Sequence, residues 1–227
     1  MAADPLASPV LTFLAGAGAP ITLREAGALR LDPDFGLFAA LADHRPESLE
    51  GMAAHVRAHG PALFMQTDAP PAVPGTKVAT EAEGVQMVAE VVVERPSPDF
   101  EIIPLTDADA PEMLALATLT RPAPFGPRTH ELGDFVGVKR DGRLIAMAGE
   151  RLRAPGMTEV SGVCTHPDHR GRGYAAGLMH HVAARIRARG ETPFLHAYAA
   201  NTGAIGLYET LGYRLRRRVL VTVLEPA

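Results

Sequence analysis

The stretch that decides the fold reads Val163-Cys164-Thr165-His166-Pro167-Asp168-His169-Arg170-Gly171-Arg172-Gly173-Tyr174-Ala175. It contains an apolar strand, a basic turn with two glycines and the start of a helix. Glycine lets a backbone approach a ligand closely, and the free amides at a helix N-terminus attract anions. The stretch therefore predicts a phosphate cradle built mainly from backbone.

A helix is expected directly after the glycine turn. Its apolar residues recur at intervals of three and four, which places them on one buried face: Ala175, Leu178, Met179, Val182 and Ile186. Other expected strands and helices of this half are strands at 100–105, 134–138, 143–150, 158–165, 194–199 and 213–224, and helices at 107–120 and 203–211. The pair Asp141-Gly142 indicates a hairpin turn between two of these strands.

Proline and glycine clusters divide the chain, and the cluster at 95–98 is the expected domain boundary. Residues 1–97 are predicted to form an N-terminal mixed α/β domain and residues 98–227 a second domain. The elements expected before the boundary are helices at 34–42 and 47–59 and a short strand at 62–65.

Composition excludes several classes of protein. The 227 residues are 47% hydrophobic with a net charge of −4, so the chain can bury a core but lacks the excess of basic residues that nucleic acids or membrane surfaces attract. No apolar run is long enough for a membrane span, and no Lys or Arg precedes the apolar opening at 6–20, which argues against a signal peptide. A single cysteine, Cys164, indicates a reducing compartment and hence the cytoplasm.

Two cofactor interpretations compete for the glycine turn. Gly171, Gly173 and Ala176 fit a GxGxxA form of the dinucleotide fingerprint. That fold requires an acidic residue at the end of the next strand, whereas Glu191 precedes the next expected strand. Residues 177–227 are also too few to complete such a domain. A nicotinamide cofactor is therefore disfavoured.

The second interpretation rests on two motifs in series. Arg170-x-x-Gly173-x-Ala175, after a strand ending Val163-x-Thr165-x-Pro167, resembles the acyl-CoA signature of the GNAT superfamily of N-acetyltransferases. Downstream, residues 201–213 resemble the second signature of that family, an Asn followed by a helix with Leu-Tyr and an end at Gly-aromatic. The resemblance covers about residues 99–227. The amino-acid sequence at 149–151, 164–167 and 194–196 is most similar to the branch with glycine N-acyltransferase-like C-terminal domains.

The resemblance implies an α/β fold of the α+β type, with a mixed central sheet flanked by helices, in residues 98–227. It also suggests that residues 1–97 are a degenerate second copy of the fold. The implied activity is transfer of an acetyl group from acetyl-CoA to the primary amine of a small molecule or amino acid, by direct attack in a ternary complex. The alternative is a non-catalytic acyl-CoA-binding or regulatory protein. A homodimer is left open.

The resemblance also implies a cofactor site. The backbone of Val163, Cys164 and Thr165 would pair with the pantetheine arm, and Asn201 would hydrogen-bond that arm or cap the following helix. The turn and the helix start would take the pyrophosphate, and the residues assigned to this end are Arg170, Gly171, Arg172, Gly173, Tyr174, Ala175 and Ala176.

By the same resemblance, Tyr208 protonates the departing thiolate, unless it merely packs against the sheet. A base must deprotonate the attacking amine, and there are two candidates. Glu159 is expected to share a strand face with Ser161 and Val163 by period 2, or to be a solvated strand end. His196 precedes Asn201 by five residues and is otherwise a buried histidine bonded to backbone.

Several other residues are assigned no chemistry. Cys164 is expected to face away from the cofactor, which disfavours a covalent acyl-enzyme. The pairs His55/His59 and His166/His169 lack a third ligand at a recognisable spacing, so no metal site is predicted. The proline-rich loop at 121–129 is expected to shape the acceptor site, where Arg121 or Arg128 could bind a carboxylate.

Overall fold

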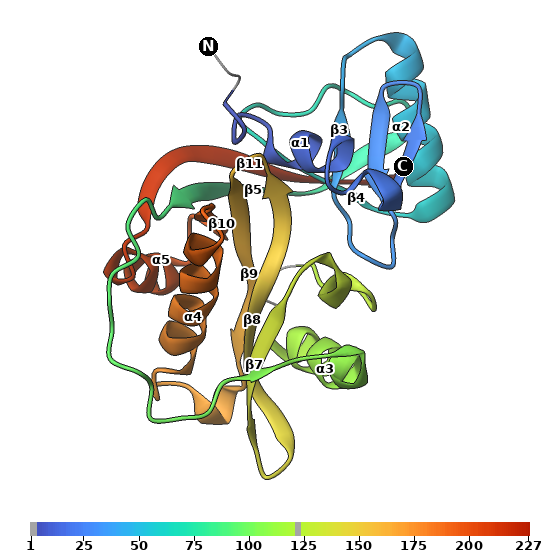
Figure 1. The fold of residues 1–227 in the computed structure, drawn as a ribbon. Coiled ribbons are helices and arrows are strands. Elements are labelled where there is room, and N and C mark those ends of the chain that lie inside the picture. The colour runs from blue at the N-terminus through green and yellow to red at the C-terminus, as the bar shows by residue number, and fades with distance from the viewer. Residues whose placement is uncertain (1–3, 121–123) are drawn as a thin grey trace.

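The computed structural model describes residues 4–120 and 124–227. Its centre is an eight-stranded mixed sheet (Figure 1). The strand order is β4 (Ala62–Gln66), β11 (Arg214–Pro226), β5 (Thr76–Val88), β10 (Thr192–Tyr198), β9 (Met157–Thr165), β8 (Arg143–Ala154), β7 (Phe135–Arg140), β6 (Ile103–Pro104). Neighbouring strands are antiparallel except β9 and β10, which are parallel.

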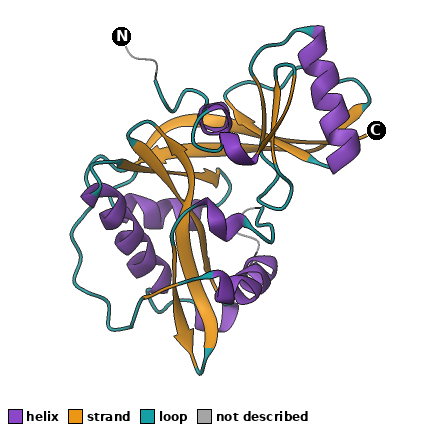
Figure 2. Ribbon diagram, turned by 45° about the vertical axis from the view of Figure 1, so that its right-hand side comes forward, coloured by secondary structure: helices purple, strands orange, loops and turns teal. Residues whose placement is uncertain are grey.

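Helices cover both faces of this sheet (Figures 1 and 2). One face carries α4 (Tyr174–Ala188) and α5 (Thr202–Thr210), and the other carries α3 (Ala110–Thr120) and α1 (Pro9–Ala15). A separate antiparallel sheet of β1 (Thr22–Glu25), β2 (Ala28–Leu31) and β3 (Ala39–Leu41) packs against α2 (Pro46–His59). The predicted mixed sheet with flanking helices is thus confirmed.

Local sequence explains the elements nearest the site. On α4, Leu178, Met179, Val182 and Ile186 are at most 2% exposed, which confirms these four residues of the predicted apolar face. Ala175, the first residue of that predicted face, is only partly buried. The hairpin formed by β7 and β8 has its turn at Asp141 and Gly142. Their φ angles of 51° and 74° are both left-handed, as a two-residue hairpin turn requires. Among the described residues, no helix is long and apolar enough to cross a membrane.

Three expectations about the fold were wrong or incomplete. Residues 34–42 do not form a helix; instead β3 pairs with β2, so tertiary hydrogen bonding decides this segment. The strand β5 was not predicted, because its first half is mostly exposed and polar and shows no apolar alternation. The strand expected at 100–105 is reduced to Ile103–Pro104.

The large sheet takes strands from both sides of the predicted boundary at residue 97. Both β4 and β5 precede the boundary, and both pair with β11 at the end of the chain. Residues 1–97 therefore extend the sheet that residues 98–227 form. A division into two domains stays a prediction.

Candidate active site

The parallel strands β9 and β10 separate partway along their length. They pair only where residues 157–159 of β9 lie beside residues 192–194 of β10. Beyond this point β9 continues beside β8, while β10 continues beside β5. The edge of β9 that follows residue 159 is therefore left without a strand neighbour on its β10 side, as an extended ligand would require.

A β-bulge shapes this free edge. Ser161 pairs with Gly149 and Cys164 with Met147, so β9 holds one residue more than β8 between these pairs. Gly162 adopts φ 63° there, and a Cβ at this position would lie 2.7 Å from the ring of Phe135. Only glycine fits both requirements.

Because of the bulge, the predicted strand faces of β9 were wrong. Glu159 and Val163 were expected on one face by strict alternation, but the extra residue inverts the pattern after Gly162. Val163 packs on the α4 side, in the cluster with Leu178 and Tyr174. Cys164 packs on the α3 side with Met113 and Leu116, and Glu159 reaches Arg151 instead.

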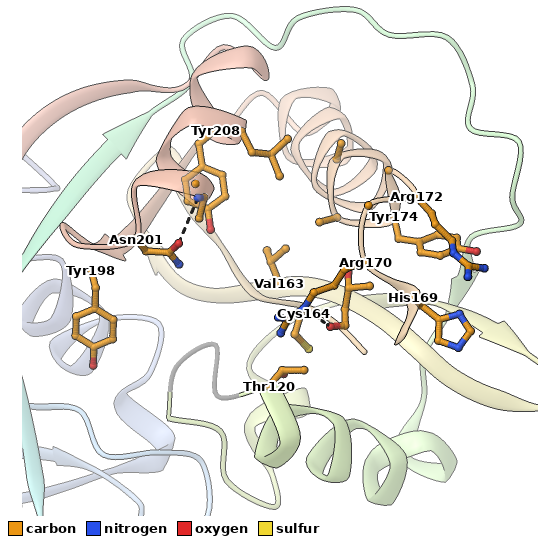
Figure 3. Close-up of a pocket in the computed structure, with 18 residues that line it drawn as sticks. Thr120, Val163, Cys164, His169, Arg170, Arg172, Tyr174, Tyr198, Asn201 and Tyr208 are labelled. Carbon is orange, nitrogen blue, oxygen red and sulfur yellow. Dashed lines mark hydrogen bonds between the residues drawn. The ribbon is translucent and has the colours of Figure 1, made fainter. Parts of the chain in front are cut away.

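A cleft of about 610 Å³ opens between the free edge of β9, the glycine turn and α5. Every residue predicted to bind the cofactor lines it: Val163, Cys164, Thr165, Arg170, Gly171, Arg172, Gly173, Tyr174, Ala175, Ala176, Asn201 and Tyr208. Thr120, His169, Tyr198 and Leu207 also line it and were not predicted. Figure 3 shows the arginines and the start of α4 at one end of the cleft and Asn201 with Tyr208 at the other.

The glycine turn presents its backbone to the cleft. Gly171 and Gly173 have φ angles of 76° and 78°, and Gly173 is the N-cap of α4 without a side-chain cap. The first amides of α4 therefore have no intrahelical acceptor. Arg170 and Arg172 are exposed, and neither has an ion-pair partner within residues 4–120 and 124–227. This end of the cleft can hold several negative charges.

The α5 end of the cleft is built by Asn201 and Tyr208. Asn201 Oδ1 accepts a hydrogen bond from the Ala204 amide at 3.3 Å, so the residue caps α5 while its side chain remains beside the cleft. The hydroxyl of Tyr208 points into the cleft towards Val163 (Figure 3). Burial raises the pKa of the Tyr208 phenol, which keeps it protonated at neutral pH.

The two candidate bases lie outside this cleft, in a buried polar cluster of four residues. Arg151 donates to both oxygens of Glu159, from Nε at 2.8 Å and from Nη2 at 2.9 Å. Nδ1 of His196 lies 2.8 Å from Glu159 Oε1. Nε2 of His196 lies 3.1 Å from the amide nitrogen of Gln86, which also donates to the Leu6 carbonyl.

This cluster fixes the protonation pattern of its members. Burial alone would raise the pKa of the Glu159 carboxyl, but the charge of Arg151 and the hydrogen bonds from His196 and Arg151 hold that pKa below its usual range. A carboxylate only accepts, so His196 carries its proton on Nδ1 and accepts from Gln86 at Nε2. The expectation that Glu159 could be a solvated strand end is wrong, because its side chain is 0% exposed.

The structure also shows the surroundings of Cys164 and Arg128, two other residues that the sequence analysis considered. The Cys164 thiol points to Thr120 (Figure 3), and burial raises its pKa to about 11, so little reactive thiolate forms at neutral pH. Within residues 4–120 and 124–227 no three metal-ligating side chains gather. Arg128 is bonded to Glu131 at 2.7 Å and 2.8 Å and stacks 4.3 Å above Phe35, so it is not a free carboxylate binder. Arg121 lies outside the described residues.

Sequence reasoning missed Arg151, Gln86 and the bulge at Gly162. A glycine inside a strand is a recognised sign of a bulge, so Gly162 could have been found from its position. Arg151 and Gln86 gave no such sign, because only the folded sheet places them beside Glu159 and His196.

Comparison with known proteins agrees with this arrangement. An FR47-like family model matches residues 135–221. Among solved structures, a GNAT-family protein named as an acetyltransferase, from Novosphingobium aromaticivorans DSM 12444, is 43% identical, with 99% of each chain covered and a TM-score of 0.88.

More distant structures share the fold. A GCN5-related N-acetyltransferase from Kribbella flavida is 20% identical with a TM-score of 0.67, covering 99% of this chain and 97% of its own. A GCN5-related N-acetyltransferase-like protein from Streptococcus suis 89/1591 is 15% identical with a TM-score of 0.55. The match covers 90% of this chain and 82% of the Streptococcus suis chain. No curated protein matches the chain.

Proposed function

Because the chain belongs to the GNAT family of acetyltransferases, we propose that it transfers an acetyl group from acetyl-CoA to the primary amine of a small molecule or amino acid. The observation that carries this proposal is the cleft between the separated strands β9 and β10, which ends at the N-terminus of α4. The likeness of residues 149–151, 164–167 and 194–196 to the glycine N-acyltransferase-like branch supports a small amine as acceptor.

In this proposal the two ends of the cleft hold the two ends of acetyl-CoA. Amides of residues 171–176, with Arg170 and Arg172, bind the pyrophosphate, where the helix dipole favours negative charge. The free edge of Val163, Cys164 and Thr165 pairs with the amide groups of pantetheine, as another strand would. The geometry thereby directs the thioester towards Tyr208.

The transfer is one substitution at the thioester carbonyl. The amine nitrogen attacks that carbon, the C–N bond forms and the C–S bond breaks. The amine loses a proton to a base, and the CoA thiolate takes the phenolic proton of Tyr208, which solvent restores. The raised pKa of Tyr208 keeps the phenol in its donating form until the thiolate appears.

Of the two candidate bases, His196 is the better proton acceptor. Both oxygens of Glu159 are bonded to Arg151, which lowers the basicity of the carboxylate. Glu159 then stabilises the imidazolium that forms when Nε2 of His196 accepts a proton, directly or through water. The Gln86 amide must release Nε2 for this step.

One observation favours the alternative, a non-catalytic acyl-CoA-binding protein. Both nitrogens of His196 already have hydrogen-bond partners, and its side chain is 5% exposed. A site that had lost its base would still bind acetyl-CoA through the glycine turn. Turnover therefore separates the two functions.

The test is incubation with acetyl-CoA and a panel of primary amines and amino acids, with free thiol and N-acetylated product measured together. We expect thiol release that depends on the amine and matches product in amount. Tight CoA binding without amine-dependent thiol release would support the non-catalytic alternative. Binding of NADH in preference to CoA would contradict both.

A matched pair of glycine variants tests the pyrophosphate site. Gly173 and Gly190 flank the two ends of α4 with φ angles of 78° and 80°, and a Cβ would meet nothing within 4 Å at either. Gly173→Ala and Gly190→Ala should therefore lower stability by similar amounts, about 1 kcal/mol. Only Gly173→Ala should weaken CoA binding, by about tenfold or 1.4 kcal/mol in a calorimetric titration. Equal affinities of the two variants would remove the turn from the site.

Two broader assignments stay proposals. Cys164 cannot form an internal disulfide, which supports a location in the cytoplasm. The division at residues 97 and 98, with residues 1–97 as a degenerate copy of the fold, rests on the sequence resemblance.

A further inference from the structure

A second, smaller cavity lies between the C-terminal end of β10 and side chains from the N-terminal part of the chain, next to the candidate base His196. Its walls are apolar side chains from residues 1–97 and from β11: Phe38, Leu63, Met65, Val219 and Val221. The remaining lining residues are Arg151, His196, Ala197 and Tyr198, and Pro124 from the loop that was expected to shape the acceptor site. Leu63 and Met65 come from β4, the outermost strand of the large sheet. The N-terminal part of the chain thus contributes three side chains, Phe38, Leu63 and Met65, to the wall of this cavity.

Gly84 lies next to the two valines that line this cavity. It lies on β5, where it pairs with Tyr198 of β10 on one side and with Val219 of β11 on the other. A Cβ at this position would lie 2.9 Å from Val219 Cγ2 and 3.4 Å from Val221 Cγ2. It would therefore point to the face that these two valines share. A side chain at this position would therefore displace the two valines of the cavity wall.

No uncompensated charge from the described residues faces this cavity. The guanidinium of Arg151 is neutralised by Glu159 and lies 4.6 Å above the Phe38 ring. His196 is bonded at both nitrogens. A charged group entering the cavity would lose its hydration without gaining a partner of opposite charge among the described residues. The cavity therefore selects for an uncharged, apolar group.

The cavity and the cleft have one wall residue in common. Tyr198, which is 42% exposed, lines both, and His196 lies two residues before it on β10. A molecule with one group in the cavity can therefore present another group to the thioester end of the cleft past Tyr198. The free volume of about 50 Å³ has room for a few methyl-sized groups.

We propose that this cavity binds the apolar side chain of the acceptor, so that the substrate is a primary amine with a short branched aliphatic group. This inference rests on the proposed acetyl transfer and specifies its acceptor. Phe38, Leu63 and Met65 of residues 1–97 then set acceptor specificity together with the valines of β11, while the cleft formed by residues 98–227 holds acetyl-CoA. A cavity lined by hydrocarbon discriminates by about 10-fold to 200-fold for each methylene-sized difference.

The first test compares acceptors of equal amine chemistry: glycinamide, valinamide, leucinamide and glutamic acid 1-amide. We expect kcat/KM for valinamide or leucinamide to exceed that for glycinamide by at least about tenfold. The glutamic acid amide should be no better than glycinamide. Acetylation of all four at equal rates would overturn the cavity assignment and leave the proposed function standing. Absence of acetylation with every amine would overturn both.

The second test uses two valines of one strand. Val221 lines the cavity, whereas Val223, two residues on and on the same side of β11, does not. Val221→Ala enlarges the cavity and should raise the ratio of kcat/KM for leucinamide over valinamide by about tenfold. Val223→Ala removes the same atoms and should leave that ratio unchanged. The same shift in both variants, or in neither, would overturn the proposal, and thermal unfolding of both variants verifies that each is folded.

Discussion

Replacement of Tyr208 by phenylalanine is expected to lower kcat by about 10²-fold to 10⁴-fold, the usual contribution of a positioned general acid. The variant removes only the hydroxyl that points into the cleft. Affinity for CoA should change little, because the turn and the free edge of β9 hold most of the ligand. The loss should therefore appear in kcat rather than in KM. Because burial raises the Tyr208 pKa, the loss of wild-type kcat that ionisation of this phenol causes should begin at a higher pH than for an exposed tyrosine.

Tyr213 provides the matched control for this experiment. Its ring lies 6.3 Å from that of Tyr208, and its buried hydroxyl has no hydrogen-bond partner among the described residues. Tyr213→Phe deletes the same atom without breaking a hydrogen bond, so kcat should be unchanged. An unchanged kcat in Tyr208→Phe would show that the tyrosine only packs against the sheet, and an equal loss in both variants would point to a shared structural effect.

Replacement of Glu159 by glutamine is expected to destabilise the fold by about 3–5 kcal/mol, because it leaves the Arg151 guanidinium buried without its counter-charge. The Glu159 side chain is 0% exposed and that of Arg151 is 7% exposed. The free energy of unfolding in urea measures the effect. Glu83→Gln breaks an exposed pair with Arg218 and should have little effect. A loss as small as that of Glu83→Gln would show that the buried pair contributes no net stability.

The stability difference between wild type and Glu159→Gln should depend on pH. The pKa of Glu159 is lowered in the folded state, so its contribution is complete above the unfolded pKa of about 4.5 and is lost as pH falls below that value. The two unfolding free energies should therefore converge in acid. A difference that stays constant from pH 7 to below pH 4 would contradict the charge-based explanation.

The cleft was predictable from sequence because its main wall is local. Residues 163–176 form a contiguous strand, turn and helix start, and glycine chemistry specifies the turn without distant partners. Asn201 follows β10 as the N-cap of α5, and Tyr208 lies on α5, at the spacing of the second signature. Their convergence on one cleft therefore follows from the order of elements in the chain.

The buried polar cluster and the second cavity were not predictable, because they depend on long-range pairing. Gln86 faces His196 only because β5, an unpredicted strand, pairs with β10. Arg151 meets Glu159 across a second irregularity in the β8 and β9 ladder, between Glu150 and Arg153. The bulge at Gly162 inverted the expected faces, since one inserted residue reverses all side chains that follow.

A crystal structure with bound acetyl-CoA tests the central claim most directly. We predict the pyrophosphate on the amides of residues 171–176 and the pantetheine arm along Val163, Cys164 and Thr165. The thioester should then lie within hydrogen-bond reach of Tyr208. Acetyl-CoA bound elsewhere on the protein, or with its pyrophosphate away from the glycine turn, would contradict the account.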